Sequence, residues 1–180
     1  MIPVISVVGK TNSGKTTLIE KIIPELKKRG YKVGAIKHDI HQFEIDHQGK
    51  DTYRMTQAGA DTVVIASSEK IAMIRKVVAA GSYPACVVAA DPWSALDKIA
   101  EWLFPDVDIV ITEGYKKQDK PKIEVNRKEV GNELLCKPEE LLCIVSDRKF
   151  DIGVRCFGLD EISAITDLIV EKMKMEELEK

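Results

Sequence analysis

The sequence contains few aromatic residues and no long apolar run. Aromatic side chains make up 6% of the 180 residues. No apolar stretch approaches the roughly 20 residues that a membrane-spanning helix needs, and the first apolar run lacks the basic leader of a secretory signal. The formal net charge is only -2, so no bulk attraction to polyanions is expected. We therefore expect a cytoplasmic protein that binds neither nucleic acid nor a membrane.

The four cysteines show no metal-binding spacing. They form no CxxC pair and lie in or beside apolar runs, at Cys86, Cys136, Cys143 and Cys156. This pattern favours buried, reduced thiols over a zinc site or disulfides.

What the chain does contain is an alternation of apolar, strand-like runs with amphipathic helical stretches, up to about residue 115. This alternation is typical of βαβ units. It predicts an α/β fold with a mostly parallel sheet and helices on both faces. The hydrophobic fraction of 44% and the charged fraction of 31% are those of a globular protein with a substantial core. We expect a single domain over residues 1–180.

The expected elements follow from apolar periodicity and from turn residues. Strands are predicted at 2–8, 31–37, 62–66, 71–78, 86–90, 107–112 and 141–145. Helices are predicted from near Gly14 to Arg29, at 51–58, from 91 to about 103, and at 160–177. Pro24 is expected to kink the first helix without dividing it, and Trp102 is expected to lie in the core.

The segment GKTNSGKTT, which follows the first apolar run, matches the P-loop pattern GxxxxGK[ST]. Its glycines let successive backbone N–H groups turn toward phosphate oxygens, and the helix that follows directs its positive end at the same anion. Lys15 is expected to reach the β and γ phosphates, and Thr16 to offer its hydroxyl to Mg²⁺. The predicted nucleotide-binding residues of this segment are Gly9, Lys10, Thr11, Asn12, Ser13, Gly14, Lys15, Thr16 and Thr17. With this motif, the expected fold is P-loop NTPase-like, and the chain is expected to be a single P-loop nucleotide-binding domain over residues 1–180.

Lys10 permits a second interpretation. It follows the first glycine, as does the signature lysine of P-loop ATPases that dimerise across the nucleotide. Thr11 and Asn12 stand where those proteins usually carry a double glycine. An ordinary surface lysine is therefore the favoured interpretation.

Two acidic residues follow apolar runs that resemble buried strands. Glu113 comes directly after the apolar run 107–112, and Asp147 comes just after the apolar run 141–145. Ligands of open α/β sheets bind at the carboxyl ends of strands. We predict that Glu113 holds Mg²⁺ or positions an attacking water; a merely solvated acid is the alternative. No NKxD motif is present, so Asp147 is a possible substitute partner for the nucleotide base.

The polar segment 36–51 contains all three histidines of the chain, His38, His41 and His47. We predict a switch-like loop that orders around Mg²⁺ and the γ-phosphate, with Asp46 near the metal and Lys37 and Lys50 facing anionic groups. A structural zinc site and a simple solvated loop remain alternatives.

Several motifs occur in a specific order: GKTNSGKTTLIEKIIPELKKRGYKVGAIKH, HQFEIDHQGKDTYR, QAGAD, ITEGYK and PKIEV. In these motifs the chain resembles the molybdopterin-guanine dinucleotide biosynthesis protein B family over nearly its full length. The resemblance implies a GTP-binding homodimer with weak GTPase activity. Such a protein would act beside the enzyme that transfers GMP to the molybdenum cofactor, so its implied partners are that enzyme and molybdopterin or the molybdenum cofactor.

The resemblance also implies roles for individual residues. It places the P-loop on the phosphates of GTP, Thr16 and Asp46 on Mg²⁺, and Glu113 near the γ-phosphate. The adjacent loop, where the pterin phosphate would also approach, would include His38, Gly49, Lys50 and Asp51. The stretch 76–91 matches no family motif.

Two other functions are compatible with a P-loop. A small-molecule kinase would usually carry a lid with clustered arginines, but the arginines here are scattered, at Arg29, Arg54, Arg75, Arg127, Arg148 and Arg155. A molybdopterin-binding or delivery module, ordered by nucleotide without significant hydrolysis, is the second alternative. No arginine is evidently placed as a finger, so slow hydrolysis is expected.

Overall fold

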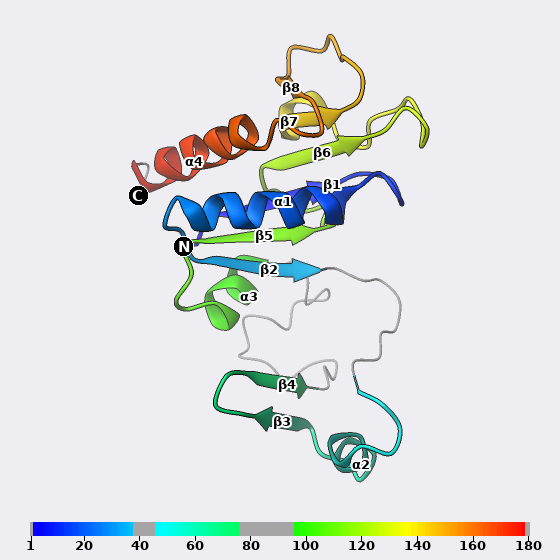
Figure 1. Cartoon of the computed structure of the whole chain (residues 1–180), viewed down its shortest axis with the longest axis vertical. Helices are drawn as coiled ribbons and strands as arrows, with labels where there is room; N and C mark the ends of the chain where they lie inside the picture. Colours follow the sequence, from blue (N-terminus) through cyan, green and yellow to red (C-terminus); the bar gives the residue numbers. More distant parts are fainter. Residues whose placement is uncertain (1, 38–45, 76–95, 179–180) are drawn as a thin grey trace. The chain divides into compact units, whose positions relative to one another are not determined.

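The computed structural model of the chain describes residues 2–37, 46–75 and 96–178 (Figure 1). The chain divides into two compact units. The first comprises Met1–His38 with Trp93–Lys180, and the second comprises Asp39–Pro92. The expectation of a single domain over residues 1–180 stays a prediction.

The first unit is built on a six-stranded sheet with the order β2-β5-β1-β6-β7-β8. Every described pairing in this sheet is parallel. The strands are β1 (Val4–Val8), β2 (Val33–Lys37), β5 (Ile109–Glu113), β6 (Lys122–Asn126), β7 (Leu141–Ser146) and β8 (Cys156–Phe157). The α/β fold class, with a P-loop NTPase-like and mostly parallel sheet, is confirmed.

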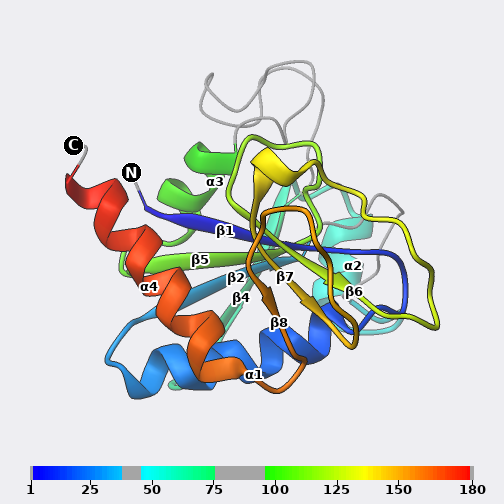
Figure 2. The ribbon, with the colours of Figure 1, turned by 90° about the horizontal axis from the view of Figure 1, so that it is seen from above.

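Helices cover both faces of this sheet (Figure 2). On one face lie α1 (Lys15–Lys28) and α4 (Ile162–Leu178), and on the other lies α3 (Leu96–Leu103). Neighbouring residues of a strand point to opposite faces, so Ile5 packs in the core under α1 and α4 while Val4 packs with Leu96 of α3. Among the described helices, none combines the length and the hydropathy needed to cross a bilayer.

Two local expectations about the helices have different outcomes. Pro24 lies inside α1, which is a single helix, as expected. Trp102 on α3 is 38% exposed, so the expectation of a core position is wrong. The spacing of apolar residues shows which side of a helix faces the core. It does not show how much of a side chain at the edge of that side is exposed.

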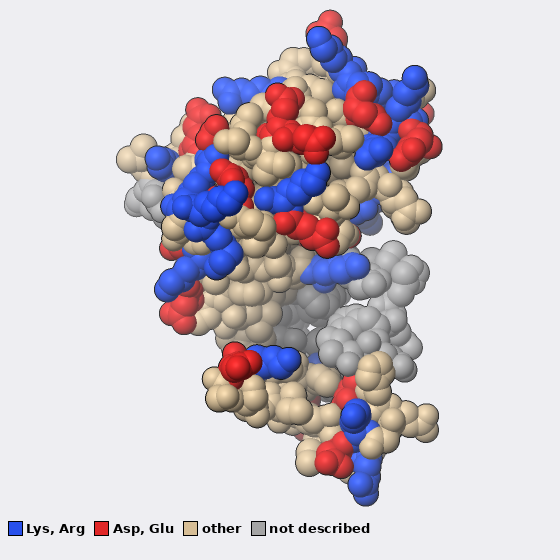
Figure 3. All heavy atoms as spheres, in the orientation of Figure 1, with Lys and Arg blue, Asp and Glu red and all other residues tan. Residues whose placement is uncertain are grey.

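Ion pairs join α1 to α4 and its preceding turn. Arg29 contacts Asp167 at 2.6 Å, and Lys21 contacts Asp160 at 2.8 Å. Figure 3 shows basic and acidic side chains intermixed over these helices. Mixed charge of this kind gives no extended field of one sign on the visible face.

The second unit contains α2 (Asp51–Gln57) and an antiparallel pair formed by β3 (Thr62–Ala66) and β4 (Ile71–Arg75). The pair is closed by a turn in which the Ser67 N–H donates to the Lys70 carbonyl at 2.9 Å. These elements match the predicted ones at 51–58, 62–66 and the start of 71–78. The strand predicted at 86–90 lies outside the described residues.

Strand β6 was not predicted, although its residues were recognised as part of a family motif. Ile123 and Val125 enter the core beneath α1, whereas Lys122, Glu124 and Asn126 are buried on the opposite face. Charged residues at alternate positions are typical of a strand with one solvated face. Here the segment from 127 to 140 covers that face instead.

The two buried charges of β6 are both satisfied. Glu124, 1% exposed, accepts hydrogen bonds from the N–H groups of Leu135 at 2.6 Å and Cys136 at 3.0 Å. The Lys122 ammonium contacts Glu140 at 3.1 Å. The Lys137 N–H and the Lys122 ammonium hold the pKa of Glu140 below its usual value. A charged side chain can be buried without a large energetic cost only when it is paired or hydrogen-bonded, as Glu124 and Lys122 are.

The described cysteines are free thiols. Burial, with Glu124 and Glu140 nearby, raises the pKa of Cys136 to about 11, and burial raises that of Cys143 to about 12. Both are buried and Cys156 is half-buried, as expected for reduced thiols. Cys86 lies outside the described residues.

We predict that Glu124→Gln destabilises the fold by about 1–3 kcal/mol, because one of the two backbone N–H donors would then face an amide N–H₂ group. Urea denaturation measures the free energy of unfolding. Glu133→Gln, an exposed acid in the same covering segment, is the control and should change stability by less than about 0.5 kcal/mol. Equal stability of the two variants would contradict the role given to Glu124.

Candidate functional site

The loop between β1 and α1 has the curled backbone that its sequence predicts. Gly9, Asn12 and Gly14 have positive φ angles of 149°, 62° and 93°. The Ser13 N–H donates to the Lys10 carbonyl at 3.2 Å and closes the turn. Glycine adopts such angles readily, and asparagine does so more easily than most residues.

Gly9 is required by close packing as well as by its backbone angle. A Cβ atom added there would lie 2.4 Å from the Val125 carbonyl oxygen and 2.6 Å from Ser13 Oγ. Ser13 Oγ is itself buried and has no hydrogen-bond partner among the described residues. The loop thus holds a buried hydroxyl with unused bonding capacity.

The start of α1 is open to an anion. Its cap residue is Gly14, which has no side chain that could bond the first N–H groups, and the first turn contains no acidic residue. The first N–H groups of a helix have no partner within the helix, and they carry its positive partial charge. These donors and the Ser13 hydroxyl together fit a phosphate group.

The Lys15 side chain crosses back over the loop. Its ammonium donates to the Lys10 carbonyl at 2.9 Å. This contact keeps the Lys15 ammonium beside the loop backbone. Its reach to the terminal phosphates stays a prediction.

The structure brings Thr16 and Glu113 together from positions 97 residues apart: the Thr16 hydroxyl donates to a Glu113 carboxylate oxygen at 2.8 Å. The contact depends on β1 and β5 being parallel neighbours, with Val7 in register with Glu113. After Glu113, Gly114 takes a φ of 100° and its N–H donates to the Val7 carbonyl at 2.9 Å. A hydroxyl and a carboxylate are oxygen ligands of the kind that Mg²⁺ prefers.

The other predicted residues of the first unit lie around this centre. Lys37, at the end of β2, is in register with Glu113. The Lys10 ammonium packs against Gly131, since a Cβ added there would lie 2.8 Å from its nitrogen. Thr11 and Asn12 are exposed. Lys10 is therefore folded onto its own chain, in keeping with an ordinary lysine.

Asp147, at the end of β7, is held by neighbours. One carboxylate oxygen accepts from the Lys128 N–H at 2.9 Å and the other from Arg127 Nε at 3.1 Å. The Lys128 N–H, followed by the Arg127 guanidinium, holds the pKa of Asp147 below its usual value. Its role as a partner of the base stays a prediction.

The predicted switch-loop residues belong mostly to the second unit, and their roles stay predictions. Asp46 accepts the His47 N–H at 2.9 Å, and its second oxygen is buried without a hydrogen-bond partner among the described residues. Lys50 is the exposed cap residue of α2. His38 and His41 lie outside the described residues. Within residues 2–37, 46–75 and 96–178, no group of three metal-ligating side chains occurs.

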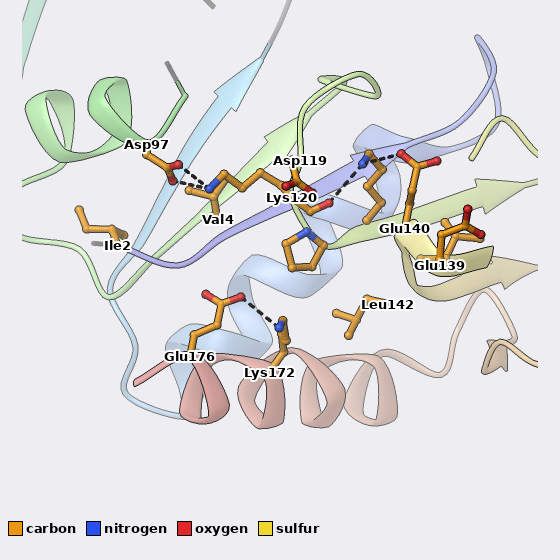
Figure 4. Close-up of a pocket in the computed structure, with 13 residues that line it drawn as sticks. Ile2, Val4, Asp97, Asp119, Lys120, Glu139, Glu140, Leu142, Lys172 and Glu176 are labelled. Carbon is orange, nitrogen blue, oxygen red and sulfur yellow. Dashed lines mark hydrogen bonds and ion pairs between the residues drawn. The ribbon is translucent and has the colours of Figure 1, made fainter. Parts of the chain in front are cut away.

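A large cavity of about 980 Å³ lies at the amino ends of the strands, where β1, β6 and β7 begin (Figure 4). Each lysine that lines it is paired with an acid: Lys120 with Asp97 at 2.5 Å, Lys122 with Glu140 at 3.1 Å and Lys172 with Glu176 at 3.5 Å. These lysines are neutralised within the chain, so the cavity lacks the character of a phosphate site despite its size.

A smaller cavity of about 220 Å³ adjoins the P-loop at Gly14 and Thr17. Its other lining residues come from α1, from β6 with the residue after it, and from the turn before α4: Leu18, Lys21, Val125, Arg127, Leu159 and Asp160. Three of them, Lys21, Arg127 and Asp160, were not predicted as site residues. Lys21 lies one helical turn after Thr17, which is a usable signal, but only the fold brings Arg127 and Asp160 beside it.

With the fold and the P-loop centre defined, comparison with known proteins identifies the family. A family model described as MobB, molybdopterin guanine dinucleotide synthesis protein B, matches residues 4–147. The chain belongs to the MobB family. The matched residues include the P-loop, Glu113 and Asp147, while Asp160 lies beyond them.

Two adapter proteins match over most of their length. The molybdopterin-guanine dinucleotide biosynthesis adapter protein of Haemophilus influenzae is 33% identical over 169 residues, covering 93% of this chain and 88% of the relative. The adapter protein of Escherichia coli is 29% identical over 180 residues, covering 97% and 95%. A crystal structure of molybdopterin-guanine biosynthesis protein B matches with a TM-score of 0.67 and 32% identity, covering 94% of this chain and 99% of that one.

We predict that Gly9→Ala destabilises the protein more than Gly30→Ala does. Gly30 also has a positive φ, of 90°, but a Cβ added there would meet no atom within 4 Å. The Gly30 substitution should therefore cost only the backbone term of about 1–2 kcal/mol. The Gly9 substitution adds a clash with β6. Urea denaturation of both variants measures the difference, and an equal loss of stability would contradict the close packing at Gly9.

Proposed function

We propose that this MobB-family chain binds Mg·GTP at the P-loop and hydrolyses it slowly, as an adapter in the biosynthesis of molybdopterin guanine dinucleotide. The observation that carries the proposal is the Thr16–Glu113 hydrogen bond of 2.8 Å beside an uncapped helix start. The role in biosynthesis is supported by the family and by the adapter proteins that the chain resembles.

In this proposal the chain's own groups bind the phosphates. The N–H groups of the P-loop and of the first turn of α1 donate to phosphate oxygens. Lys15 exchanges its bond to the Lys10 carbonyl for a stronger, charge-assisted bond to the terminal phosphates. The Ser13 hydroxyl, buried and unused, is a further donor within the loop.

Thr16 and Glu113 would hold Mg²⁺, with Asp46 as a further predicted ligand from the second unit. When bound, the ion would neutralise charge on the β and γ phosphates. Glu113 would also orient the attacking water, since its carboxylate lies beside Thr16 at the end of a buried strand. The donor set is all oxygen, which fits a hard divalent cation.

Slow hydrolysis is consistent with the arginine that lines the cavity beside the P-loop. Arg127 is paired with Asp147 at 3.1 Å and with Glu129 at 3.5 Å, and so is engaged within the chain. Arginine fingers typically accelerate hydrolysis by about 10³-fold to 10⁵-fold. With Arg127 engaged in this way, the chain is suited to act by binding GTP, as an adapter to the GMP-transferring enzyme and to molybdopterin would. The proposal includes a cytoplasmic homodimer.

We predict that Lys15→Ala weakens GTP binding by roughly 100-fold or more, because it removes a charge-assisted contact to two phosphates. Lys27→Ala, an exposed lysine on the same helix, should bind GTP like the parent. Isothermal titration with Mg·GTP measures both affinities, and light scattering of the same samples measures the oligomeric state. If Lys15→Ala binds GTP as tightly as the parent, the P-loop assignment is wrong.

Glu113→Gln should remove most of the Mg²⁺ dependence of GTP binding and lower the hydrolysis rate by roughly 10²-fold or more. The measurements are GTP affinity with and without Mg²⁺, and phosphate release. Glu139→Gln, an exposed acid at the opposite end of the sheet, serves as the control. An unchanged ratio of the affinities with and without Mg²⁺ in Glu113→Gln would show that the carboxylate does not hold the ion.

A further inference from the structure

The small cavity beside the P-loop is placed to receive the part of a nucleotide that extends beyond its phosphates. It shares Gly14 and Thr17 with the phosphate loop, and it is also lined by residues at the end of β6 and in the turn before α4. Ligands of open parallel sheets lie at these carboxyl ends. A nucleotide anchored by its phosphates would therefore direct its base into this cavity or past it.

The lining suits a base rather than a further phosphate. Leu159 offers partly exposed apolar surface and Arg127 offers a planar guanidinium, while Leu18 and Val125 line the cavity as buried residues. Flat aromatic bases stack on apolar side chains and on guanidinium planes. The remaining charged groups of the lining are Lys21 and Asp160, whose side chains form a donor and acceptor pair at 2.8 Å.

The acidic neighbours of Arg127 fix its guanidinium. Asp147 binds Nε at 3.1 Å, and Glu129 lies 3.5 Å from Nη2. Both oxygens of Asp147 are engaged, one by Arg127 and one by the Lys128 N–H. Asp147 is thus arranged to orient Arg127, and Asp160 is the acid that faces the cavity with unused acceptor capacity.

We propose that this cavity binds the base of the nucleotide and that the Lys21–Asp160 pair makes it selective for guanine over adenine. The inference rests on the proposed nucleotide binding and adds the residues that choose the base. Guanine presents its O6 acceptor beside the N1–H and N2–H₂ donors. The O6 acceptor matches the Lys21 ammonium, and the two donors match the Asp160 carboxylate. Adenine presents the N6–H₂ donor beside the N1 acceptor, so Asp160 would face a lone pair.

The pair is suited to exchange partners. The Asp160 side chain is 89% exposed and that of Lys21 is 43% exposed, so neither is locked in the core. The Lys21 ammonium holds the pKa of Asp160 below its usual value, which keeps the carboxylate a pure acceptor near neutral pH. A bidentate contact of this kind typically discriminates between bases by roughly 5-fold to 150-fold.

The test compares the affinities of GTP, ITP, XTP and ATP, each with Mg²⁺, for the parent chain and for Asp160→Asn. The parent should prefer GTP to ATP, and ITP should bind more weakly than GTP because it lacks the 2-amino group. Asp160→Asn should lose GTP affinity by roughly 5-fold to 150-fold and gain affinity for XTP, since xanthine carries a carbonyl where guanine carries the amino group. ATP affinity should change little.

Asp167→Asn is the matched control. Like Asp160→Asn, this substitution removes one negative charge, and it breaks the 2.6 Å ion pair between Asp167 and Arg29. Asp167 does not line the small cavity. Its nucleotide preferences should equal those of the parent. Thermal unfolding of both variants checks that each is folded.

The Arg127→Ala variant distinguishes the stacking of the base from the selection of guanine over adenine. It should weaken GTP and ATP by the same factor, because a stacking surface contacts every base through its face. Asp147→Ala should have the same effect, and the double variant should lose no more than either single one, since Asp147 acts through Arg127. Additive losses would contradict this role of Asp147.

The base-site proposal is overturned if the parent binds GTP and ATP equally, or if Asp160→Asn keeps the parent's ratio of GTP to XTP affinity. Lys15→Ala distinguishes this failure from that of the proposed function. Loss of all nucleotide binding in Lys15→Ala, with an unchanged ratio in Asp160→Asn, would leave the phosphate site intact and place base recognition elsewhere. Retained binding in Lys15→Ala would overturn the proposed function itself.

Discussion

The parallel pairing of β1 with β5 on one side and β6 on the other is the constraint on which the site depends. It places the end of β5 beside α1, so that Glu113 receives the Thr16 hydroxyl. It also places the Val125 carbonyl of β6 against Gly9, where no side chain fits. The phosphate loop is therefore shaped by its neighbouring strands as much as by its own glycines.

Burial of charge in β6 serves the same arrangement. Glu124 fastens the segment after β6 through two backbone N–H groups, and the turn at the start of that segment carries Arg127. A hydrophobic residue at 124 would leave those N–H groups without an acceptor. The buried carboxylate thus helps hold the wall of the small cavity, although it lies on the face of the sheet opposite α1.

The two cavities show that size is a poor guide to chemistry in this fold. The larger one, at the amino ends of the strands, is lined by lysines that the chain neutralises itself. The smaller one adjoins the start of α1, whose first N–H groups have no partner within the helix, and its Lys21–Asp160 pair is more exposed than the ion pairs of the larger cavity. Recognition of a nucleotide requires groups with unused bonding capacity, and these lie at the carboxyl ends of the strands.

The sequence alone determined the features that depend on neighbours along the chain. The P-loop, the helix after it and the strand that ends at Glu113 follow from glycine spacing and apolar periodicity, and the family motifs identified the MobB family. Strand β6 was not predicted because Lys122 and Glu124 are charged residues of the kind that is usually exposed to solvent. Their burial depends on the segment 127–140, which covers them only in the folded protein. The Thr16–Glu113 contact and the grouping of Lys21, Arg127 and Asp160 were decided by tertiary structure. Parallel strands bring together residues about a hundred positions apart, and no local pattern records that proximity.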